Sequence, residues 1–104
     1  MNKVVDGPSP PYYAVIAPAE LQEDVRGYPE LAAKLVEFAK QQPGFIGIES
    51  GSQGGFALAV SYWTSLEAIQ AWKENTHHLL AKHKGKTAWF KKYVTRIAKV
   101  ERVY

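Results

Sequence analysis

The chain has 104 residues and no cysteine, with 46% apolar and 22% charged residues. This length and composition are typical of one globular domain with a single core. No apolar run approaches the roughly 20 residues of a membrane-spanning helix, and the first residues lack the apolar stretch of a secretory signal. The absence of cysteine excludes disulfides, thiolate metal sites and a cysteine nucleophile, and it suits a reducing compartment. We therefore expect a cytoplasmic protein with no membrane contact.

Charge is distributed unevenly along the chain. Residues 1–52 hold four basic and seven acidic side chains, whereas residues 53–104 hold nine basic and three acidic ones. Five lysines lie between Lys82 and Lys92, and such a cluster can contact nucleic acid or an anionic ligand. No nucleic-acid motif accompanies it, and cations are favoured near helix C-termini. We therefore interpret the lysines as a solvated surface and expect no nucleic-acid partner.

Changes in the period of the apolar residues divide the chain into elements. Residues 1–11, rich in proline, are expected to form a flexible arm before a single domain at residues 12–104. Alternating and branched residues predict strands, apolar residues spaced by three and four predict helices, and the Gly-rich turn GSQGG predicts a hairpin. The expected elements are strand Tyr12–Ala17 ended by Pro18, a helix from Tyr28 to Pro43-Gly44, strands Phe45–Ser50 and Phe56–Trp63, a helix from Leu66, and strand Phe90–Tyr104.

The second helix and the last strand carry two further expectations. The helix opens on capping-box spacing, with Thr64 as N-cap and Glu67 three residues later. We expect it to break near Asn75-Thr76, where a second helical segment would be capped and run on toward Gly85. The strand from Phe90 is much longer than the usual five or six residues, so we expect it to reach beyond its own sheet.

The order βαββαβ predicts an α+β ferredoxin-like sandwich, an antiparallel sheet with both helices on one face. Strand Phe56–Trp63 is apolar on both of its faces, although the helices can cover only one. A second copy of the chain is the simplest cover for the other face. We therefore expect a homodimer whose two sheets face each other.

Most motifs of catalytic or cofactor sites are missing from the sequence. Gly85-Lys86-Thr87 lacks the earlier glycine of a phosphate loop, and neither a dinucleotide-binding nor a GxSxG motif is present. The three histidines offer no pair spaced by four residues, so we expect no metal site. What remains is a set of aromatic and polar residues able to line a small-molecule site: Trp63, Trp72, Asn75, His77, His78, His83, Trp89, Tyr93 and Arg96.

Each of these residues also has a purely structural interpretation. Trp72 lies three residues after Ile69, as a core residue would, and Tyr13 and Tyr93 suit strands in any case. Arg96 alternates with apolar residues, so we expect it to be partly buried beside an anion or a carboxylate.

The sequence resembles the antibiotic biosynthesis monooxygenase family over about residues 12–104. The resemblance is carried by QQPGFIGIES, by SYW followed by AxxAW, and by the closing RIAxVER. It implies a dimeric α/β barrel of two ferredoxin-like subunits. It also implies oxygenation of phenolic substrates without metal, flavin or haem, in which a base removes a substrate proton and the resulting anion itself reduces O₂. A neutral imidazole suits the base, and arginine, asparagine or an indole N–H suits the anion.

Carried over by position, the family's site residues give specific expectations. His78 is the expected base, with Arg96 and Asn75 as partners of the anion. His78 and Trp72 lie about 120° apart on an unbroken helix, so they converge only if the expected break occurs. The expected substrate-binding residues are Trp72, Tyr93, Trp63, Tyr13 and His83.

The sequence therefore predicts a cofactor-independent monooxygenase acting with O₂ on a small aromatic, quinol-type compound. One alternative is a non-catalytic dimer that binds a hydrophobic metabolite at the same place. A haem-binding or haem-degrading protein is a third possibility, in which His83 would face the haem. The first strand lacks the asparagine of haem-degrading relatives, which argues against haem.

Overall fold

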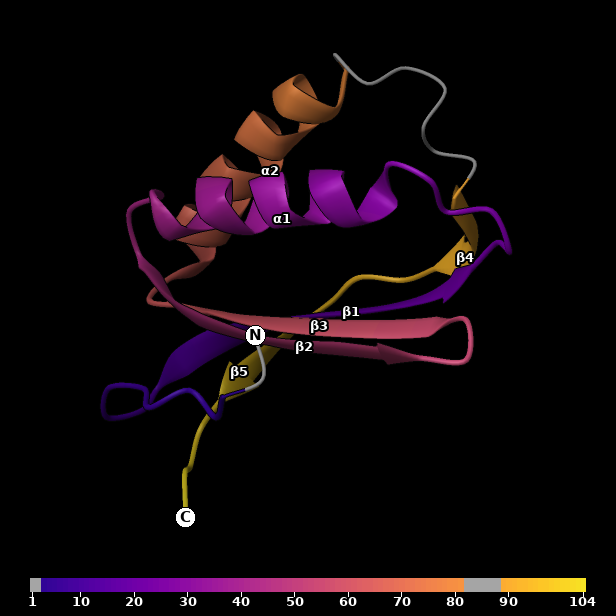
Figure 1. The fold of residues 1–104 in the computed structure, drawn as a ribbon. Coiled ribbons are helices and arrows are strands. Elements are labelled where there is room, and N and C mark those ends of the chain that lie inside the picture. The colour runs from indigo at the N-terminus through magenta and orange to yellow at the C-terminus, as the bar shows by residue number, and fades with distance from the viewer. Residues whose placement is uncertain (1–2, 82–88) are drawn as a thin grey trace.

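The computed structural model of the chain describes residues 3–81 and 89–104, with the backbone alone for residues 77–81. The elements are β1 (Tyr12–Leu21), α1 (Tyr28–Lys40), β2 (Phe45–Gln53), β3 (Phe56–Trp63), α2 (Leu66–Ala81), β4 (Phe90–Tyr93) and β5 (Arg96–Val100). The strands form one antiparallel sheet in the order β2-β3-β1-β4, and β5 also pairs with β1. Both helices lie on the same face of this sheet (Figure 1). The predicted α+β ferredoxin-like fold is thus confirmed.

The end of the chain forms two short strands, so the prediction of one long strand from Phe90 to Tyr104 is wrong. The interruption lies opposite Pro18, which β1 runs through instead of ending before it. The Pro18 carbonyl accepts a hydrogen bond from the Val94 N–H at 3.2 Å. The N–H and C=O of a strand residue point toward the same neighbouring strand. Because the Pro18 carbonyl faces the last strand, the N–H that proline lacks would also have bonded to that strand. That ladder is interrupted here, and Val94 and Thr95 fall between β4 and β5.

Helix α2 is continuous, so the expected break at Asn75-Thr76 is wrong. No proline or glycine lies between its ends, and nothing in the sequence forces the helix to stop there. Its cap is also one residue later than predicted, because the Ser65 hydroxyl accepts a hydrogen bond from the Ala68 N–H at 3.1 Å. Neither α1 nor any other helix in the described ranges is long and apolar enough to cross a membrane.

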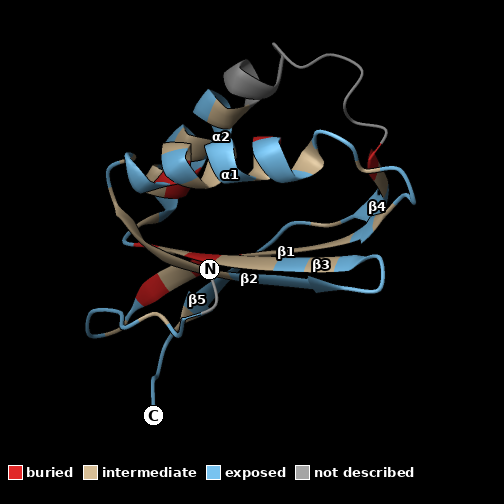
Figure 2. Ribbon diagram, in the orientation of Figure 1, coloured by how far each residue is buried: buried red, intermediate tan, exposed pale blue. Residues whose placement is uncertain are grey.

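The core lies where α1 ends and α2 begins. Trp63 is completely buried there and clusters with Val15, Ala39 and Ile69. Figure 2 shows buried residues at this end and exposed residues at the β2–β3 hairpin, and Leu31 and Trp89 are also buried, outside this cluster. The aromatic core therefore joins both helices to one half of the sheet.

A tight turn at Gly44 connects α1 to β2 and rests on the first turn of α2. Gly44 has φ +85°, a conformation that side chains disfavour. A Cβ at this position would lie 2.7 Å from the Cβ of Ala68 and 2.7 Å from the Oγ1 of Thr64. The turn therefore requires glycine for both its backbone conformation and its packing.

We predict that Gly44→Ala lowers the free energy of unfolding by about 2 kcal/mol or more, from backbone strain and overpacking together. Chemical denaturation followed by circular dichroism measures the change. Gly51→Ala is the matched control, because Gly51 lies in a strand with nothing within 4 Å of its added Cβ. Equal stability of the two variants would contradict this interpretation of the turn.

Glu49 joins the N-terminal segment to the sheet. Its carboxylate accepts hydrogen bonds from the Tyr62 hydroxyl at 2.6 Å and from the Val5 N–H at 2.9 Å. These bonds, that from Tyr62 foremost, lower the pKa of Glu49 below its ordinary 4.5. Burial, reinforced by Glu49, raises the pKa of Tyr62 to about 12. The division into an arm at 1–11 and a domain at 12–104 stays a prediction.

We predict that Tyr62→Phe raises the pKa of Glu49 toward 4.5. A carboxyl group whose pKa is lowered on folding stabilises the fold above its ordinary pKa, and this contribution is lost as pH falls through the folded-state pKa. Above pH 4.5, the variant therefore lacks part of the contribution that ionised Glu49 makes to the free energy of unfolding of the wild type. A ¹³C carboxyl NMR titration measures the shift, with the fully exposed Tyr104→Phe as control. An unchanged Glu49 pKa would mean that the Tyr62 bond does not hold it.

Candidate functional site

Strand register divides the side chains of the sheet between two faces. Tyr13 pairs with Trp63 and Val15 with Ser61, and these residues lie on the face that the helices cover. Side chains alternate along a strand. The next residues, such as Tyr62, therefore belong to the opposite face, which we call the open face. The face of each candidate residue follows from this alternation.

Three aromatic rings pack together where α2 meets the sheet, Phe45 edge-on to Trp63 and Trp72 tilted by 34° against it. The Trp63 ring lies 5.0 Å from the Trp72 ring and 5.4 Å from the Phe45 ring, measured between centroids. Tyr13 packs against the same cluster. Trp72 thus joins α2 to the core, as its structural interpretation expected.

The tryptophans differ in whether their indole N–H has a partner. Trp63 donates to the Ser61 hydroxyl at 2.9 Å, and Trp89 donates to the Arg26 carbonyl at 3.0 Å. Trp72 Nε1 and Thr76 Oγ1 are both buried, and neither has a hydrogen-bond partner among the described residues. A buried polar group without a partner costs about 1–3 kcal/mol. Such groups are candidates for contacts with a ligand.

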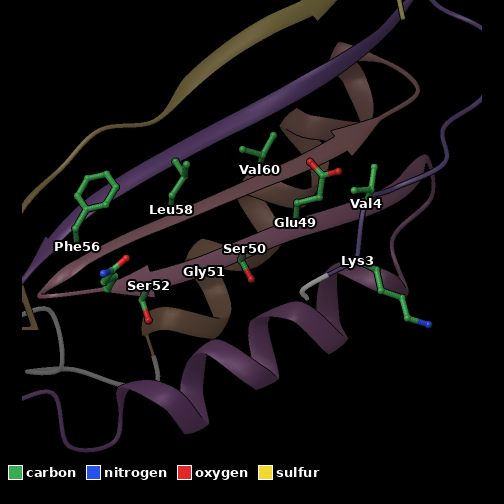
Figure 3. Close-up of a pocket in the computed structure, with 10 residues that line it drawn as sticks. Lys3, Val4, Glu49, Ser50, Gly51, Ser52, Phe56, Leu58 and Val60 are labelled. Carbon is green, nitrogen blue, oxygen red and sulfur yellow. The ribbon is translucent and has the colours of Figure 1, made fainter. Parts of the chain in front are cut away.

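Small side chains line the helix-covered face beyond the core. Ala17 pairs with Ala59 and Ala19 pairs with Ala57, so four alanines lie side by side on β1 and β3. β2 extends this floor with two serines, which point away from the open face (Figure 3). These alanines stay partly accessible although they lie on the helix-covered face. We call this set the small-residue floor: Ala17, Ala19, Ala57, Ala59, Ser50 and Ser52.

A second aromatic cluster lies at the far end of this floor. Tyr28, at the start of α1, contacts Trp89 and Phe90 with ring centroids 5.6 and 5.5 Å apart. Tyr93 pairs with Ala19 and lies 5.5 Å from the Phe90 ring. Burial raises the pKa of Tyr28. Both ends of α1 are therefore held by aromatic residues, one cluster at each end of the small-residue floor.

The structure brings together some of the predicted substrate-binding residues. Trp72, Trp63 and Tyr13 meet in the core cluster, but Trp63 is completely buried and its N–H is satisfied. Tyr93 lies on the same face at the other aromatic cluster, with 68% of its surface exposed. Of this group, Trp72 is the residue whose polar atom is buried without a hydrogen-bond partner among the described residues.

The predicted partners of the anion lie elsewhere. Arg96 pairs with Ile16, which places it on the open face, and its side chain is exposed where partial burial was expected. The expectation failed because both faces of this strand are apolar, which hides the alternation. Asn75 is exposed and donates to the Gln42 side chain at 3.2 Å. The side chains of His77 and His78 and the whole of His83 lie outside the described residues.

Two features of this side were not predicted. Thr76 was expected only as part of a helix break, whereas its place four residues after Trp72 already puts both on one helix face. The alanines were visible as alternate residues of Phe56–Trp63, but their alignment with β1 depends on strand register. Neither feature has a distinctive motif: spacing could have placed Thr76 on the Trp72 face of the helix, but it could not have aligned the alanines.

The open face carries a shallow hollow beside the N-terminal segment. Its volume is about 760 Å³, and Phe56, Leu58 and Val60 form its apolar wall (Figure 3). Phe56 and Leu58 are 48% and 39% exposed. This apolar strip lies on the face opposite Trp72, so it forms a separate surface.

Comparison with known proteins identifies the family. The sequence profile described as antibiotic biosynthesis monooxygenase matches residues 15–84. A relative from Bacillus subtilis (strain 168), the uncharacterized protein YqjZ, is 46% identical over 96 residues, covering 91% of this chain and 84% of its own.

Solved structures show the same fold at low sequence identity. A mutant of SnoaB from Streptomyces nogalater, described as a cofactor-independent oxygenase, has a TM-score of 0.74 at 13% identity, covering 88% of this chain and 95% of its own. PA3566 from Pseudomonas aeruginosa has a TM-score of 0.70 at 16% identity, with coverages of 94% and 100%. Because the profile spans more than half of the chain and YqjZ is closely similar in sequence, the chain belongs to the antibiotic biosynthesis monooxygenase family.

Proposed function

We propose that this protein is a cytoplasmic, cofactor-independent monooxygenase that oxidises a small aromatic, quinol-type compound with O₂. The proposed site lies between α2 and the helix-covered face of the sheet, beside Trp72 and the small-residue floor. Family membership supports the reaction class, as does the fold shared with SnoaB, itself described as a cofactor-independent oxygenase.

The indole N–H of Trp72, which has no hydrogen-bond partner in the described part of the chain, carries this proposal. The fold supplies an acceptor to the N–H of Trp63 and of Trp89, but none of the described residues accepts from Trp72. A phenolate or enolate oxygen is a strong acceptor for such a donor. In a water-poor site, a fixed donor stabilises developing negative charge without reorganisation. Trp72 therefore suits the anion through which the substrate reacts with O₂.

The reaction needs no reductant other than the substrate. In an anthrone, a base removes one proton from the CH₂ group, and the resulting anion gives an electron to O₂. Recombination forms a carbon–oxygen bond, and loss of water leaves a carbonyl, so that one oxygen atom enters the product and the other leaves as water. The carbon supplies all four electrons that O₂ accepts.

His78 on α2 is the proposed base, because a neutral imidazole accepts protons near neutral pH. Because α2 is continuous, His78 lies about 120° from Trp72 around the helix. The expected convergence of the two residues is therefore lost, and the effect of His78→Ala on oxygen uptake decides this role. Arg96 and Asn75 were expected to stabilise the anion, but Arg96 lies on the open face and Asn75 is bound to Gln42. The proposal therefore assigns the contact with the anion to Trp72.

The non-catalytic alternative keeps one observation in its favour. With Arg96 on the open face, the Trp72 side lacks the guanidinium expected to stabilise an anion. A protein that only binds an apolar aromatic compound needs no such charge. Oxygen uptake separates the two functions.

We also propose that the protein works as a homodimer whose open faces pack together. Phe56 and Leu58 are large apolar residues left exposed on a sheet whose helices cover only its other face. Exposed apolar strips of this kind mark interaction surfaces. A second copy brings an identical strip, as two-fold symmetry requires.

We predict protein-dependent oxygen uptake with anthrones or hydroquinones in chelator-treated buffer. His78→Ala lowers kcat by about 100-fold or more if it is the base, and Trp72→Phe lowers it at least about tenfold by removing one donor. His77→Ala is the control for the neighbouring histidine. Saturable binding without uptake would favour the non-catalytic alternative.

We predict that Leu58→Glu converts a dimer into monomers, because the new charge is buried between the facing sheets. Light scattering coupled to size-exclusion chromatography measures the mass. Ala33→Glu, at an exposed position of α1, is the control. A wild-type monomer, or a dimer that persists in Leu58→Glu, would refute this arrangement.

A further inference from the structure

We propose that Thr76 is a second polar contact in the Trp72 site and selects substrates that carry two oxygen atoms on one edge. This inference rests on the proposed function only in placing the ligand beside Trp72. It adds the residue and the feature of the ligand that it recognises.

The continuity of α2 places Thr76 beside Trp72. Ile69, Trp72 and Thr76 are separated by three and four residues, so they form one stripe of the helix. Ile69 belongs to the core and Trp72 stacks on Trp63, so this stripe faces the sheet. Thr76 follows one turn later on the same side.

The hydroxyl of Thr76 lacks the local bond that such a residue commonly makes. A threonine within a helix often donates to a carbonyl of the preceding turn. Thr76 Oγ1 is buried, yet neither a helix carbonyl nor another described group is within hydrogen-bond geometry of it. Trp72 Nε1 is in the same state one turn earlier. These two buried groups, on neighbouring turns of α2, thus both lack a hydrogen-bond partner among the described residues.

The chemistry of the two groups defines the ligand. An indole N–H only donates, so the ligand atom beside Trp72 must be an acceptor such as a carbonyl or phenolate oxygen. A hydroxyl donates and accepts, so Thr76 suits a neighbouring phenol or carbonyl. A site with a buried polar group that needs a hydrogen-bond partner binds an analogue without the matching oxygen more weakly, because the group then stays without a partner. Both atoms are buried in the structure, so a ligand must displace the groups that cover them in order to bind there.

Anaerobic binding of two probes tests this inference. Anthrone has one oxygen, whereas 1,8-dihydroxyanthrone has hydroxyl groups on both sides of the same carbonyl. Titration under nitrogen, followed by tryptophan fluorescence, gives Kd for each. We expect wild type to prefer the dihydroxy compound, and Thr76→Val to reduce the ratio of the two affinities roughly 3- to 10-fold, the value of one hydrogen bond. Thr76→Ser restores the ratio, and Thr95→Val, at an exposed residue between β4 and β5, leaves it unchanged.

The outcomes separate this inference from the proposed function. A ratio that Thr76→Val does not change would overturn the role of Thr76, even if the protein consumes oxygen. Failure of the wild type to bind either probe would also overturn the role of Thr76. A ratio that depends on Thr76 without oxygen uptake would support the contact and refute the monooxygenase.

Discussion

The packing of Trp63 holds together the parts from which the site is built. Its ring touches Phe45 at the start of β2 and Trp72 on α2, and it clusters with Ala39 near the end of α1. Large aromatic rings contribute much of the burial in a small core. Because the indole N–H finds its partner two residues away in Ser61, Trp63 needs nothing further from its surroundings. Trp72 is oriented by this packing, while its own N–H remains without a partner among the described residues.

The two faces of the sheet differ in packing and in proposed function. The helix-covered face has a packed half around Trp63 and an accessible half over the alanines of β1 and β3. The open face has an apolar strip at Phe56 and Leu58, with Glu49 and Tyr62 joined by a hydrogen bond near it. In the proposed assembly, the first face binds substrate and the second binds another copy of the chain. The two surfaces are separate because successive side chains of a strand point to opposite faces of the sheet.

Much of the fold follows from local sequence patterns, whereas much of the site does not. The order βαββαβ was readable because Pro43-Gly44, GSQGG and the hydroxyls before Leu66 end or start elements in characteristic ways. The prediction that Pro18 ends the first strand was wrong, because a proline inside a strand removes only one hydrogen bond of the ladder. Here the strand continues through Pro18, and the last strand opposite it is divided into β4 and β5. The face of Arg96 depends on its register with Ile16, which no local pattern encodes. That Trp72 and Thr76 find no hydrogen-bond partner among the described residues depends on tertiary packing, which residue spacing does not reveal.

Helix α1 is held at its two ends by separate aromatic clusters, around Trp63 and around Trp89, with the small-residue floor between them. The residues that set the distance between α1 and the sheet are therefore different from those that form the surface of the sheet beneath the helix. Substitutions in the floor alter the space for a ligand while both clusters stay intact, and mutations at distant independent sites have nearly additive effects. Such a division lets a lineage exchange one ligand for another in small steps while remaining above the stability threshold for folding. A fold of this kind is well suited to diversify in substrate preference while its architecture stays constant.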